Sequence, residues 1–459
     1  MRISPVRRLP AALLFLALAA AAPVGAQAPD GRLELETFLD FERVGDPRLS
    51  PDESSIIYTR GWVDRMADSW ESSLWIMDAD GSRNRFLVDG SSARWSPDGT
   101  RIAYTARGEP TGSQIFVRWM DGEGAVSQIT RVQESPGDIA WSPDGEWLAF
   151  TMLVPDDADP DWRVSVPGRP EGAKWTEQPR IITALNFRRD RQGFYEQGDR
   201  HVFVVPADGG TPRQVSSGAW SHSSPRWLPD GKTLVFSSLR TEDSEYAWRE
   251  SELYAVDVAS GQIRQLTSRK GPDYGPAPSP DGRHIAYMGY DYNEDTYVVP
   301  QLWVMNADGS NPRLLSGAVD ERAGSPMWAA DGSGVYFGVA AEGREHLWFA
   351  PLNGQARQLT RGMVQVDVTD VGRRLAVGTR TSPHAPDDVV ALDLRAREPR
   401  VTQLTRVNDD ILAGVELGEV EEIWYPSVGG ERIQGWIVKP PRFDAARKYP
   451  LMLSIHGGP

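Results

Sequence analysis

Short runs of alternating apolar and polar residues fill most of the chain, and sequences typical of tight turns separate them. Residues 101–105 and 147–151 are two such runs, and each closely follows a tight-turn sequence. An alternation with a period of two predicts a β-strand, because successive side chains of a strand point to opposite faces. The pattern therefore predicts an all-β protein built from short strands.

One tight-turn sequence recurs and marks a repeat. Five copies read Ser-Pro-Asp-Gly or differ from it at one position, and they begin at Ser50, Ser96, Ser142, Leu228 and Ser279. Two weaker copies follow at residues 329–332 and 369–372. This composition is typical of a type I turn, in which Pro presets φ at the second position. Each copy predicts a tight reversal between strands, with the Asp side chain capping local backbone amides rather than binding metal.

Each repeat contains further strands. A third strand with its own turn recurs almost unchanged at residues 74–81 and 302–309, and short fourth strands are expected at residues 358–360 and 403–405. Four strands in each of several repeats predict the blades of a β-propeller. A tryptophan precedes the turn at the same point of several repeats, and these side chains are expected to pack between blades rather than to bind a ligand. They are Trp95, Trp141 and Trp227.

The spacing of the turns sets the number of blades. Most successive turns lie about 40 to 50 residues apart, the length of one blade, but 86 residues separate Asp144 from Asp230. Either one blade carries a long insertion, or two blades lie here and the second has a degraded turn near residues 189–193. Residues 153–180 hold five prolines and little alternation, which favours the insertion. The sequence therefore predicts a seven-bladed β-propeller, with eight blades as the alternative.

The insertion is the first candidate for a binding region, because long loops on a rigid scaffold often carry binding groups. Its aromatic and charged side chains are able to meet one end of a peptide, and they are Trp175, Arg188, Arg189, Asp190, Phe194 and Tyr195. The alternative is a loop that only covers the edge of a blade. No metal site is expected, because the five histidines before residue 400 lack ligand spacing, and so do the insertion's carboxylates Asp156, Asp157, Asp159 and Asp161.

The first residues have the pattern of an export signal. Three arginines precede an apolar run over residues 9–22, and Val24-Gly25-Ala26 offers a cleavage site. We predict cleavage after Ala26. The run is shorter than the roughly 18 residues that a membrane span needs. A secreted protein with no membrane partner after signal removal is therefore expected.

Composition excludes several kinds of site. The chain has no cysteine and a formal net charge of -15 at pH 7. Without cysteine there is no disulfide, thiolate metal site or cysteine nucleophile, and the acidic balance argues against nucleic acid as a partner. An exported protein without disulfides is expected in a bacterial periplasm.

The repeat stops after Thr405, and a different pattern begins. A hairpin is predicted from residues 421–426 and 433–441, with its turn at Gly429-Gly430. The continuous apolar run at residues 451–455 predicts a strand covered on both faces. It leads into His456-Gly457-Gly458-Pro459. Glycines at the exit of such a strand allow backbone amides to approach a reacting group.

A propeller of Ser-Pro-Asp-Gly repeats, followed by this hairpin and the apolar strand, resembles the prolyl oligopeptidase family of serine peptidases, and in particular its acylaminoacyl-peptidase and dipeptidyl-peptidase-like bacterial branch. The resemblance implies a propeller over residues 27–410, after the signal at residues 1–26, that gates access to a hydrolase cleaving short peptides. Residues 411–459 would be the first strands of a truncated α/β-hydrolase domain. His456, Gly457 and Gly458 would form its oxyanion loop, and no cofactor is implied.

The sequence departs from that family in its catalytic motifs. No Gly-x-Ser-x-Gly occurs, and the order of the α/β-hydrolase triad places Ser, Asp and His after this sequence. His456 belongs to the glycine loop and is not the triad base, so no catalytic residue is assigned. We expect a fragment of a serine peptidase that is inactive alone. The alternative is a non-catalytic periplasmic binding propeller, similar to that of the Tol system.

Overall fold

The computed structural model describes most of the chain. It covers residues 31–156, 167–176, 180, 182, 184–190, 192–194, 196–295, 297–317, 319–455 and 457. The predicted export signal and several predicted residues lie outside this range, namely Asp157, Asp159, Asp161, Tyr195, His456 and Gly458.

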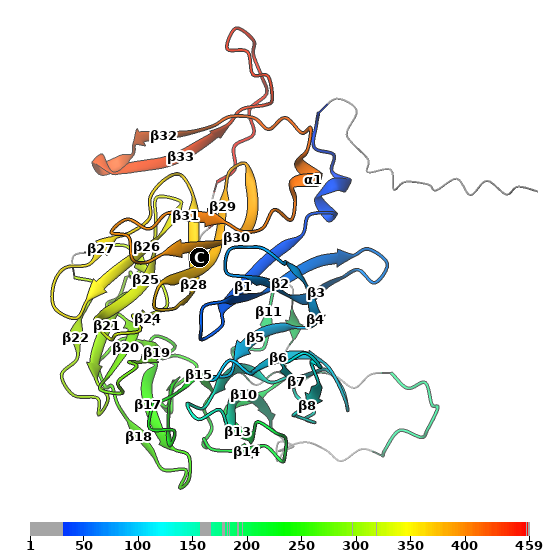
Figure 1. The fold of residues 1–459 in the computed structure, drawn as a ribbon, viewed down its shortest axis with the longest axis vertical. Coiled ribbons are helices and arrows are strands. Elements are labelled where there is room, and N and C mark those ends of the chain that lie inside the picture. The colour runs from blue at the N-terminus through cyan, green and yellow to red at the C-terminus, as the bar shows by residue number, and fades with distance from the viewer. Residues whose placement is uncertain are drawn as a thin grey trace, which may run out of the picture.

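Seven antiparallel blades surround one axis (Figure 1). Blade 1 consists of β1 (Arg43–Leu49), β2 (Ser55–Asp64), β3 (Ser69–Asp78) and β4 (Arg85–Asp89). Blade 2 consists of β5 (Ser91–Trp95), β6 (Arg101–Arg107), β7 (Ser113–Trp119) and β8 (Val126–Gln128). Blade 3 consists of β9 (Gly137–Trp141), β10 (Trp147–Pro155), β13 (Gly198–Pro206) and β14 (Arg213–Gln214). In all three, the strand that comes first in the chain lies at one edge of the sheet.

The other four blades follow the same plan. Blade 4 consists of β15 (His222–Trp227), β16 (Thr233–Ser238), β17 (Glu252–Asp257) and β18 (Ile263–Gln265). Blade 5 consists of β19 (Asp273–Pro278), β20 (His284–Gly289), β21 (Gln301–Asn306) and β22 (Arg313–Leu314). Blade 6 has a divided first strand, β23 (Arg322–Ala323) and β24 (Met327–Trp328), then β25 (Gly334–Ala341), β26 (Arg344–Pro351) and β27 (Arg357–Gln358). Blade 7 consists of β28 (Gln365–Val371), β29 (Leu375–Ser382), β30 (Ala385–Asp393) and β31 (Val401–Gln403).

The first strands of the blades form a closed ring around the axis. β1, β5, β9, β15, β19, β24 and β28 each contact the next in this order, and β28 contacts β1 again. Apolar side chains fill the space between neighbouring blades, as Phe150 and Phe203 do between blades 2 and 3. The predicted seven-bladed propeller is confirmed.

The long interval between Asp144 and Asp230 is one blade with an insertion, as predicted. β10 and β13 pair directly, from Trp147 opposite Pro206 to Pro155 opposite Gly198. The chain between them therefore leaves and re-enters a single hairpin. Two short strands within it, β11 (Arg188–Arg189) and β12 (Gly193–Phe194), pair only with each other, so no eighth blade exists in the described part of the chain.

The recurrent turns are held by their own side chains. Ser96 donates from Oγ to Oδ1 of Asp98 over 2.6 Å, and the same carboxylate oxygen accepts the backbone N–H of Thr100 over 3.1 Å. Gly99 closes the turn with a φ of 72°, which costs glycine little. The hydrogen bond from Ser96 is the main reason why the pKa of Asp98 falls to about 2. These bonds recur in blades 3 and 5, so the prediction that the turn aspartates cap local amides is confirmed.

Tryptophan indoles join neighbouring blades, as predicted. Trp141 of blade 3 donates from Nε1 to the backbone oxygen of Arg94 in blade 2, over 2.9 Å. An equivalent bond joins blade 2 to blade 1, blade 4 to blade 3 and blade 6 to blade 5. Each indole thus combines apolar packing with one directed bond to the blade before it.

The last predicted turn, at residues 369–372, is wrong. Residues 369–371 lie in β28, and the chain reverses at residues 372–374. This shorter turn has no Asp of its own to cap its amides. Instead the carboxylate of Glu53 in blade 1 accepts the backbone N–H groups of residues 373–375 over 2.7 to 3.2 Å.

Blades 1 and 7 are each built from consecutive strands, and no strand is shared between them. Side chains therefore close the ring at this joint. Asp370 accepts the backbone N–H of Leu49 over 2.9 Å. Asn408 receives the backbone N–H of Glu42 over 2.9 Å and donates to its carbonyl oxygen over 3.0 Å. Apolar residues of both blades pack in one cluster behind these bonds.

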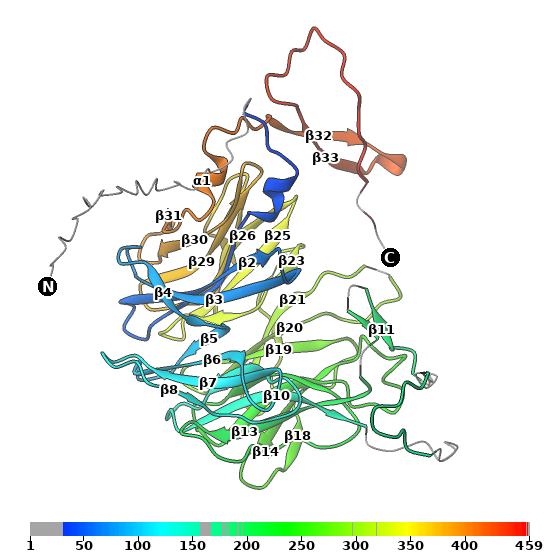
Figure 2. The same ribbon diagram turned by 90° about the vertical axis from the view of Figure 1, so that its right-hand side faces the viewer.

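Two short segments flank the propeller before the predicted hairpin. They are η1 (Glu36–Leu39), a 3-10 helix, and α1 (Asp409–Leu412). The hairpin is confirmed, because β32 (Val420–Pro426) pairs with β33 (Arg432–Val438) around the 3-10 turn η2 (Val428–Gly430). Figure 2 shows this hairpin projecting beyond the blades.

The prediction of a buried strand at residues 451–455 is wrong for this structure. The segment forms no strand, and Leu451 and Met452 are 87% and 95% exposed. A strand needs a neighbour for its backbone hydrogen bonds, and the described residues provide none here. Its apolar side chains consequently face solvent.

The described residues contain no helix that is long and apolar enough to cross a membrane. They also contain no group of three or more His, Asp or Glu side chains arranged to hold a metal ion.

Candidate binding site at the propeller axis

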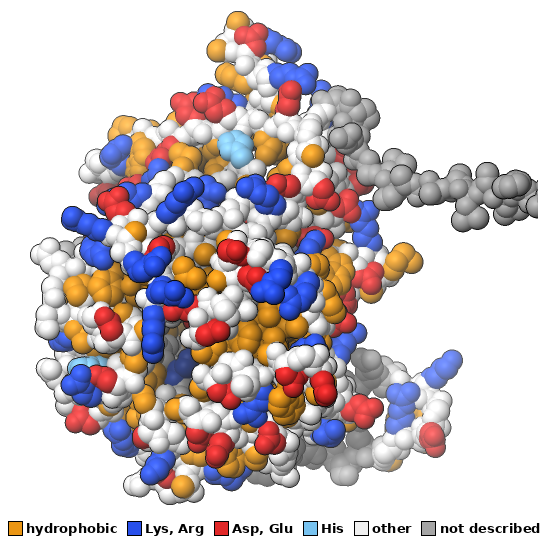
Figure 3. Space-filling model, viewed as in Figure 1, with side chains coloured by type: hydrophobic (Ala, Val, Ile, Leu, Met, Phe, Trp, Pro, Cys, Tyr) orange, Lys and Arg blue, Asp and Glu red, His pale blue; other side chains and the backbone are white. Residues whose placement is uncertain are grey.

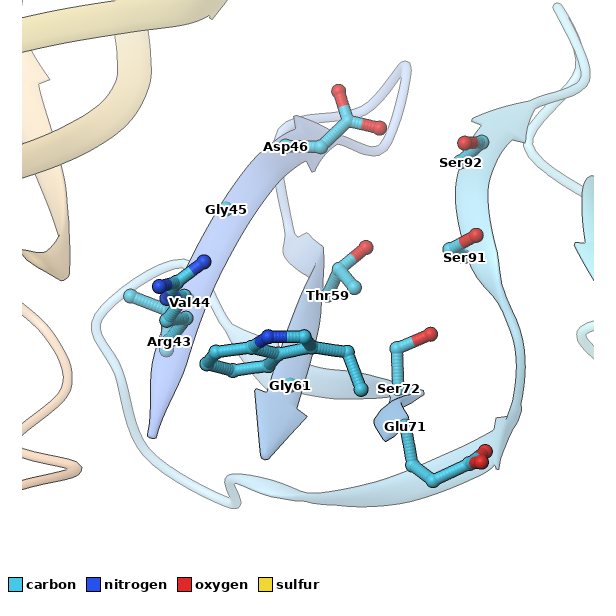
Figure 4. Close-up of a pocket in the computed structure, with 11 residues that line it drawn as sticks. Arg43, Val44, Gly45, Asp46, Thr59, Gly61, Glu71, Ser72, Ser91 and Ser92 are labelled. Carbon is cyan, nitrogen blue, oxygen red and sulfur yellow. The ribbon is translucent and has the colours of Figure 1, made fainter. Parts of the chain in front are cut away.

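A groove of about 470 Å³ opens between blades 1 and 2. Figure 4 shows Asp46 of β1 on one wall, and Ser91 and Ser92 of β5 on the other. At the other end of β1, the Arg43 guanidinium lies 3.9 Å from the centre of the Trp70 ring. The groove therefore offers polar groups at one end and an aromatic surface at the other.

Irregularities in the first strands shape this groove. The pairing of β1 with β2 shifts between Gly45 and Arg48, and β5 shifts at the corresponding point. Asp46 and Ser92 take φ values of 49° and 59° at these bulges. A bulge bends the strand and changes the direction of its side chains, and the absence of a side chain at Gly45 leaves the space beside it open.

Asp46 holds two arginines together. Its Oδ1 accepts Nε of Arg48 over 2.8 Å, and its Oδ2 accepts Nη1 of Arg94 over 2.7 Å. Burial and the nearby Arg48 charge lower the pKa of Arg94. One carboxylate therefore serves two guanidinium groups, each only partly exposed.

A third arginine, Arg226, occupies the same position in blade 4. Its Nη1 donates to the backbone oxygen of Pro225 over 2.9 Å, and no carboxylate among the described residues forms an ion pair with it. The side chain is exposed to solvent, and partial loss of hydration among the surrounding protein atoms lowers the pKa of Arg226. Repulsion by Arg94 and Arg48 lowers it further, against attraction by Asp138.

The three arginines are equivalent residues of their blades. Arg48, Arg94 and Arg226 each stand two positions before the recurrent turn, and each pairs with the second strand directly after the bulge. The other blades have Ala140, Ala277, Met327 and Asp370 at this point. Because the three arginines hold one register position on the inner strands of a closed ring, and Arg48 and Arg94 already share Asp46, the side chains are directed toward one axis. The space-filling view shows a recess near the middle of the ring, with basic side chains at its edge (Figure 3).

An apolar pocket of about 620 Å³ lies on the other side of Trp70, between blades 1 and 7. Phe38, Leu39 and Phe41 line it, and Phe38 is 67% exposed. The pocket lies where the chain enters blade 1. Its lining is more apolar than that of the groove, so it suits contact with another apolar surface better than recognition of a charge.

The hairpin β32–β33 is attached to loops of blades 6 and 7. Arg344 of blade 6 pairs with Glu422, and Gln434 donates from Nε2 to the backbone oxygen of Glu342 over 3.0 Å. In blade 7, His384 donates from Nε2 to the carbonyl oxygen of Gly418 over 2.8 Å. These contacts hold the hairpin, while many of its apolar side chains remain exposed.

The structure brings together only some of the insertion residues predicted to meet a peptide. Arg188 and Phe194 lie on the small β11–β12 sheet, with the Arg188 guanidinium 5.8 Å from the Phe194 ring centre. Arg189 and Asp190 are exposed beside them, and Trp175 is 48% exposed. Their role in binding stays a prediction. At Gly457, the described member of the predicted oxyanion loop, the space that a side chain would occupy is open.

Sequence reasoning missed the three axial arginines and Glu53. The signal for the arginines was present, because they share one position relative to the turn. Their convergence depends on the ring, which places blades 1 and 4 across the axis from each other.

Known proteins resemble this chain over most of its length. The family model for the TolB β-propeller domain, PD40, matches residues 61–237 and 193–369. The uncharacterized peptidase YuxL of Bacillus subtilis is 24% identical over 91% of this chain and 65% of its own. Dipeptidyl-peptidase 5 of Porphyromonas endodontalis is 26% identical over 92% of this chain and 62% of its own.

Solved structures show the same fold. An acylaminoacyl peptidase from Pyrococcus horikoshii superposes with a TM-score of 0.71 and 18% identity, over 90% of this chain and 60% of its own. The chain thus spans just under two thirds of the length of the curated relatives it matches. It belongs to the TolB β-propeller family.

Proposed function

We propose that this chain is the propeller part of a serine peptidase, and that it controls the access of short peptides to an α/β-hydrolase domain. The observation that carries the proposal is the apolar segment at residues 451–455, which is exposed and has no partner strand in the described structure. The relatedness to peptidases supports it.

Apolar side chains of the hairpin and of residues 451–455 are exposed together. Met452 is 95% exposed and Leu453 is 78% exposed, and Val438 at the end of the hairpin is 72% exposed. Each apolar side chain of this size gains about 1.5 to 3 kcal/mol when it is fully buried. A hydrolase sheet that adds residues 451–455 as one of its strands would provide that burial and would satisfy the backbone groups.

The propeller has two features suited to controlling access. The inner strands close around the axis without a break, and arginines converge on that axis. The groove between blades 1 and 2 runs from Trp70 to Asp46 beside it. A short extended peptide fits such openings, whereas a folded protein does not.

The catalytic step would depend on residues outside this sequence, since it contains no Gly-x-Ser-x-Gly. In the proposed peptidase, backbone amides near Gly457 would help to shape the oxyanion site. We therefore expect the chain alone to hydrolyse nothing.

A fluorophosphonate probe, which labels activated serines, tests this proposal. The purified chain should remain unlabelled and should not cleave dipeptidyl or acylaminoacyl fluorogenic substrates. The native gene product should be labelled and should cleave at least one of them. Labelling of the chain alone would contradict the assignment of the nucleophile, and an unlabelled native product would favour the binding propeller instead.

We also propose that the protein is exported to a bacterial periplasm. The arginines and apolar run before Ala26, together with the absence of cysteine, support this. Amino-terminal sequencing of the protein from a periplasmic extract should begin at Gln27. A product that retains residues 1–26 in the cytoplasmic fraction would overturn the proposal.

A further inference from the structure

We propose that Arg48, Arg94 and Arg226 form a site on the propeller axis that binds a carboxylate group of a short peptide. The site itself follows from the described side chains, and only the peptide nature of its ligand rests on the proposed function.

The three arginines come from separate blades: Arg48 and Arg94 share Asp46, and Arg226 holds the equivalent position in blade 4. Each arginine stands directly after the bulge of its inner strand. The bulge turns the strand in the same way in each blade, as the φ values of 49° at Asp46, 59° at Ser92 and 54° at Ser224 show. Equivalent positions on a ring of strands point toward the same axis, so the cluster is a consequence of the repeat.

Ion pairs among the described residues serve only two of the three arginines. Asp46 is shared between Arg48 and Arg94, and Arg226 has no ion pair within the described chain. The charge of Asp138 attracts Arg226. However, Oδ2 of Asp138 accepts a hydrogen bond from Oγ1 of Thr151 over 3.1 Å. An added anion would therefore bind Arg226 without having to displace an existing ion pair.

Asp370 does not supply the missing charge. It stands at the equivalent position of blade 7, and its two carboxylate oxygens accept the backbone N–H groups of Leu49 and Val371 over 2.9 and 3.0 Å. Burial raises its pKa, although Arg48 opposes this. Its carboxylate is committed to the seam between blades 1 and 7.

Carboxylate is the ligand chemistry that fits best. A guanidinium presents parallel N–H groups that match the two oxygens of a carboxylate. The groove between blades 1 and 2 reaches Asp46, so a peptide lying against Trp70 and Ser91 would bring one end to the arginines. A large polyanion is disfavoured by the net charge of -15.

Calorimetry with the full chain tests the site at low ionic strength. The probes are acetyl-trialanine with a free carboxyl end, the same peptide as its amide, and an acetylated amide in which the middle alanine is glutamate. The free acid should bind about tenfold more tightly than the amide. If the glutamate amide binds as tightly as the free acid, the site accepts any carboxylate of a peptide. If it binds as weakly as the plain amide, the site is specific for the carboxylate at the end of the peptide.

The variant Arg226→Gln should weaken binding of the free acid about tenfold and leave binding of the amide unchanged. Arg213→Gln is the matched control, because Arg213 is also exposed and also donates to one backbone oxygen, that of Val258, over 2.7 Å. Thermal unfolding of both variants checks their folding. Equal binding of acid and amide, or no binding of either, would overturn the site, as would equal losses in the two variants.

This experiment is independent of the peptidase proposal. It needs no hydrolase domain and reads binding alone, so the carboxylate site can fail while serine labelling of the native product succeeds. The reverse result would leave an anion-binding propeller that is not part of a peptidase.

Discussion

Blades that follow each other along the chain are joined differently from blades 7 and 1, which close the ring. Between blades 2 and 3, an indole of Trp141 donates to a backbone oxygen and each blade caps its own turn. Between blades 7 and 1, carboxylates accept the hydrogen bonds instead. Glu53 caps the turn of blade 7, and Asp370 accepts a backbone N–H of blade 1. The indole bond recurs at four of the internal joints, those of blades 1–2, 2–3, 3–4 and 5–6, whereas the closing joint uses residues that depart from the repeat.

The departure at Glu53 has a clear physical reason. The fourth residue of the turn is otherwise glycine, and Glu53 takes a φ of 58° in its place. A side chain with this backbone conformation is strained. The cost is offset because the buried carboxylate receives several amides of a turn that has no Asp.

The largest expected effect is loss of the closing joint in Glu53→Ala. Removing a buried carboxylate leaves the amides of residues 373–375 without their acceptor, and we expect a loss of about 3 kcal/mol in the free energy of unfolding. Urea denaturation measures it. Glu146→Ala is the control, because Glu146 lies beside the turn of blade 3 but is exposed. If both variants lose the same amount, Glu53 does not close the ring.

Much of the fold could be predicted from the sequence, because its determinants are local. The Ser-Pro-Asp-Gly turns specify their own hydrogen bonds, and the prolines of the insertion identified a single blade across the interval from Asp144 to Asp230. The position of Trp141 before its turn predicted packing between blades. Each of these depends on residues within one repeat or on their spacing.

The rest depended on contacts between distant parts of the chain. Glu53 and its partner Arg373 are 320 residues apart. The role of a Glu in place of Gly in this turn could therefore not be predicted without knowing that blades 1 and 7 are in contact. The convergence of the axial arginines likewise requires the closed ring. The apolar run at residues 451–455 was predicted as a buried strand from composition alone, but burial needs partner strands that the described residues do not supply.

The internal joints can be tested with Trp141→Phe, for which a smaller effect is expected. Phenylalanine keeps most of the apolar contact but cannot donate to the backbone oxygen of Arg94, so a loss of about 1 kcal/mol is expected. Thermal or urea unfolding measures it. Trp175→Phe is the control, because Trp175 is 48% exposed in the insertion. A Trp141 variant as stable as this control would mean that the indole bond does not join the blades.

The smallest expected effect lies within one turn and depends on pH. The bond from Ser96 lowers the pKa of Asp98 from 3.8 to about 2. Its carboxylate therefore stabilises the folded protein above about pH 4, and this contribution is lost as pH falls toward 2. Asp98→Asn should lower the thermal midpoint at pH 7, by less than Trp141→Phe because the turn is exposed, and the difference from wild type should shrink between pH 4 and pH 2.5. Asp190→Asn, in the exposed insertion, should match wild type throughout. A difference for Asp98→Asn that stays constant down to pH 2.5 would show that the charged carboxylate is not what holds the turn.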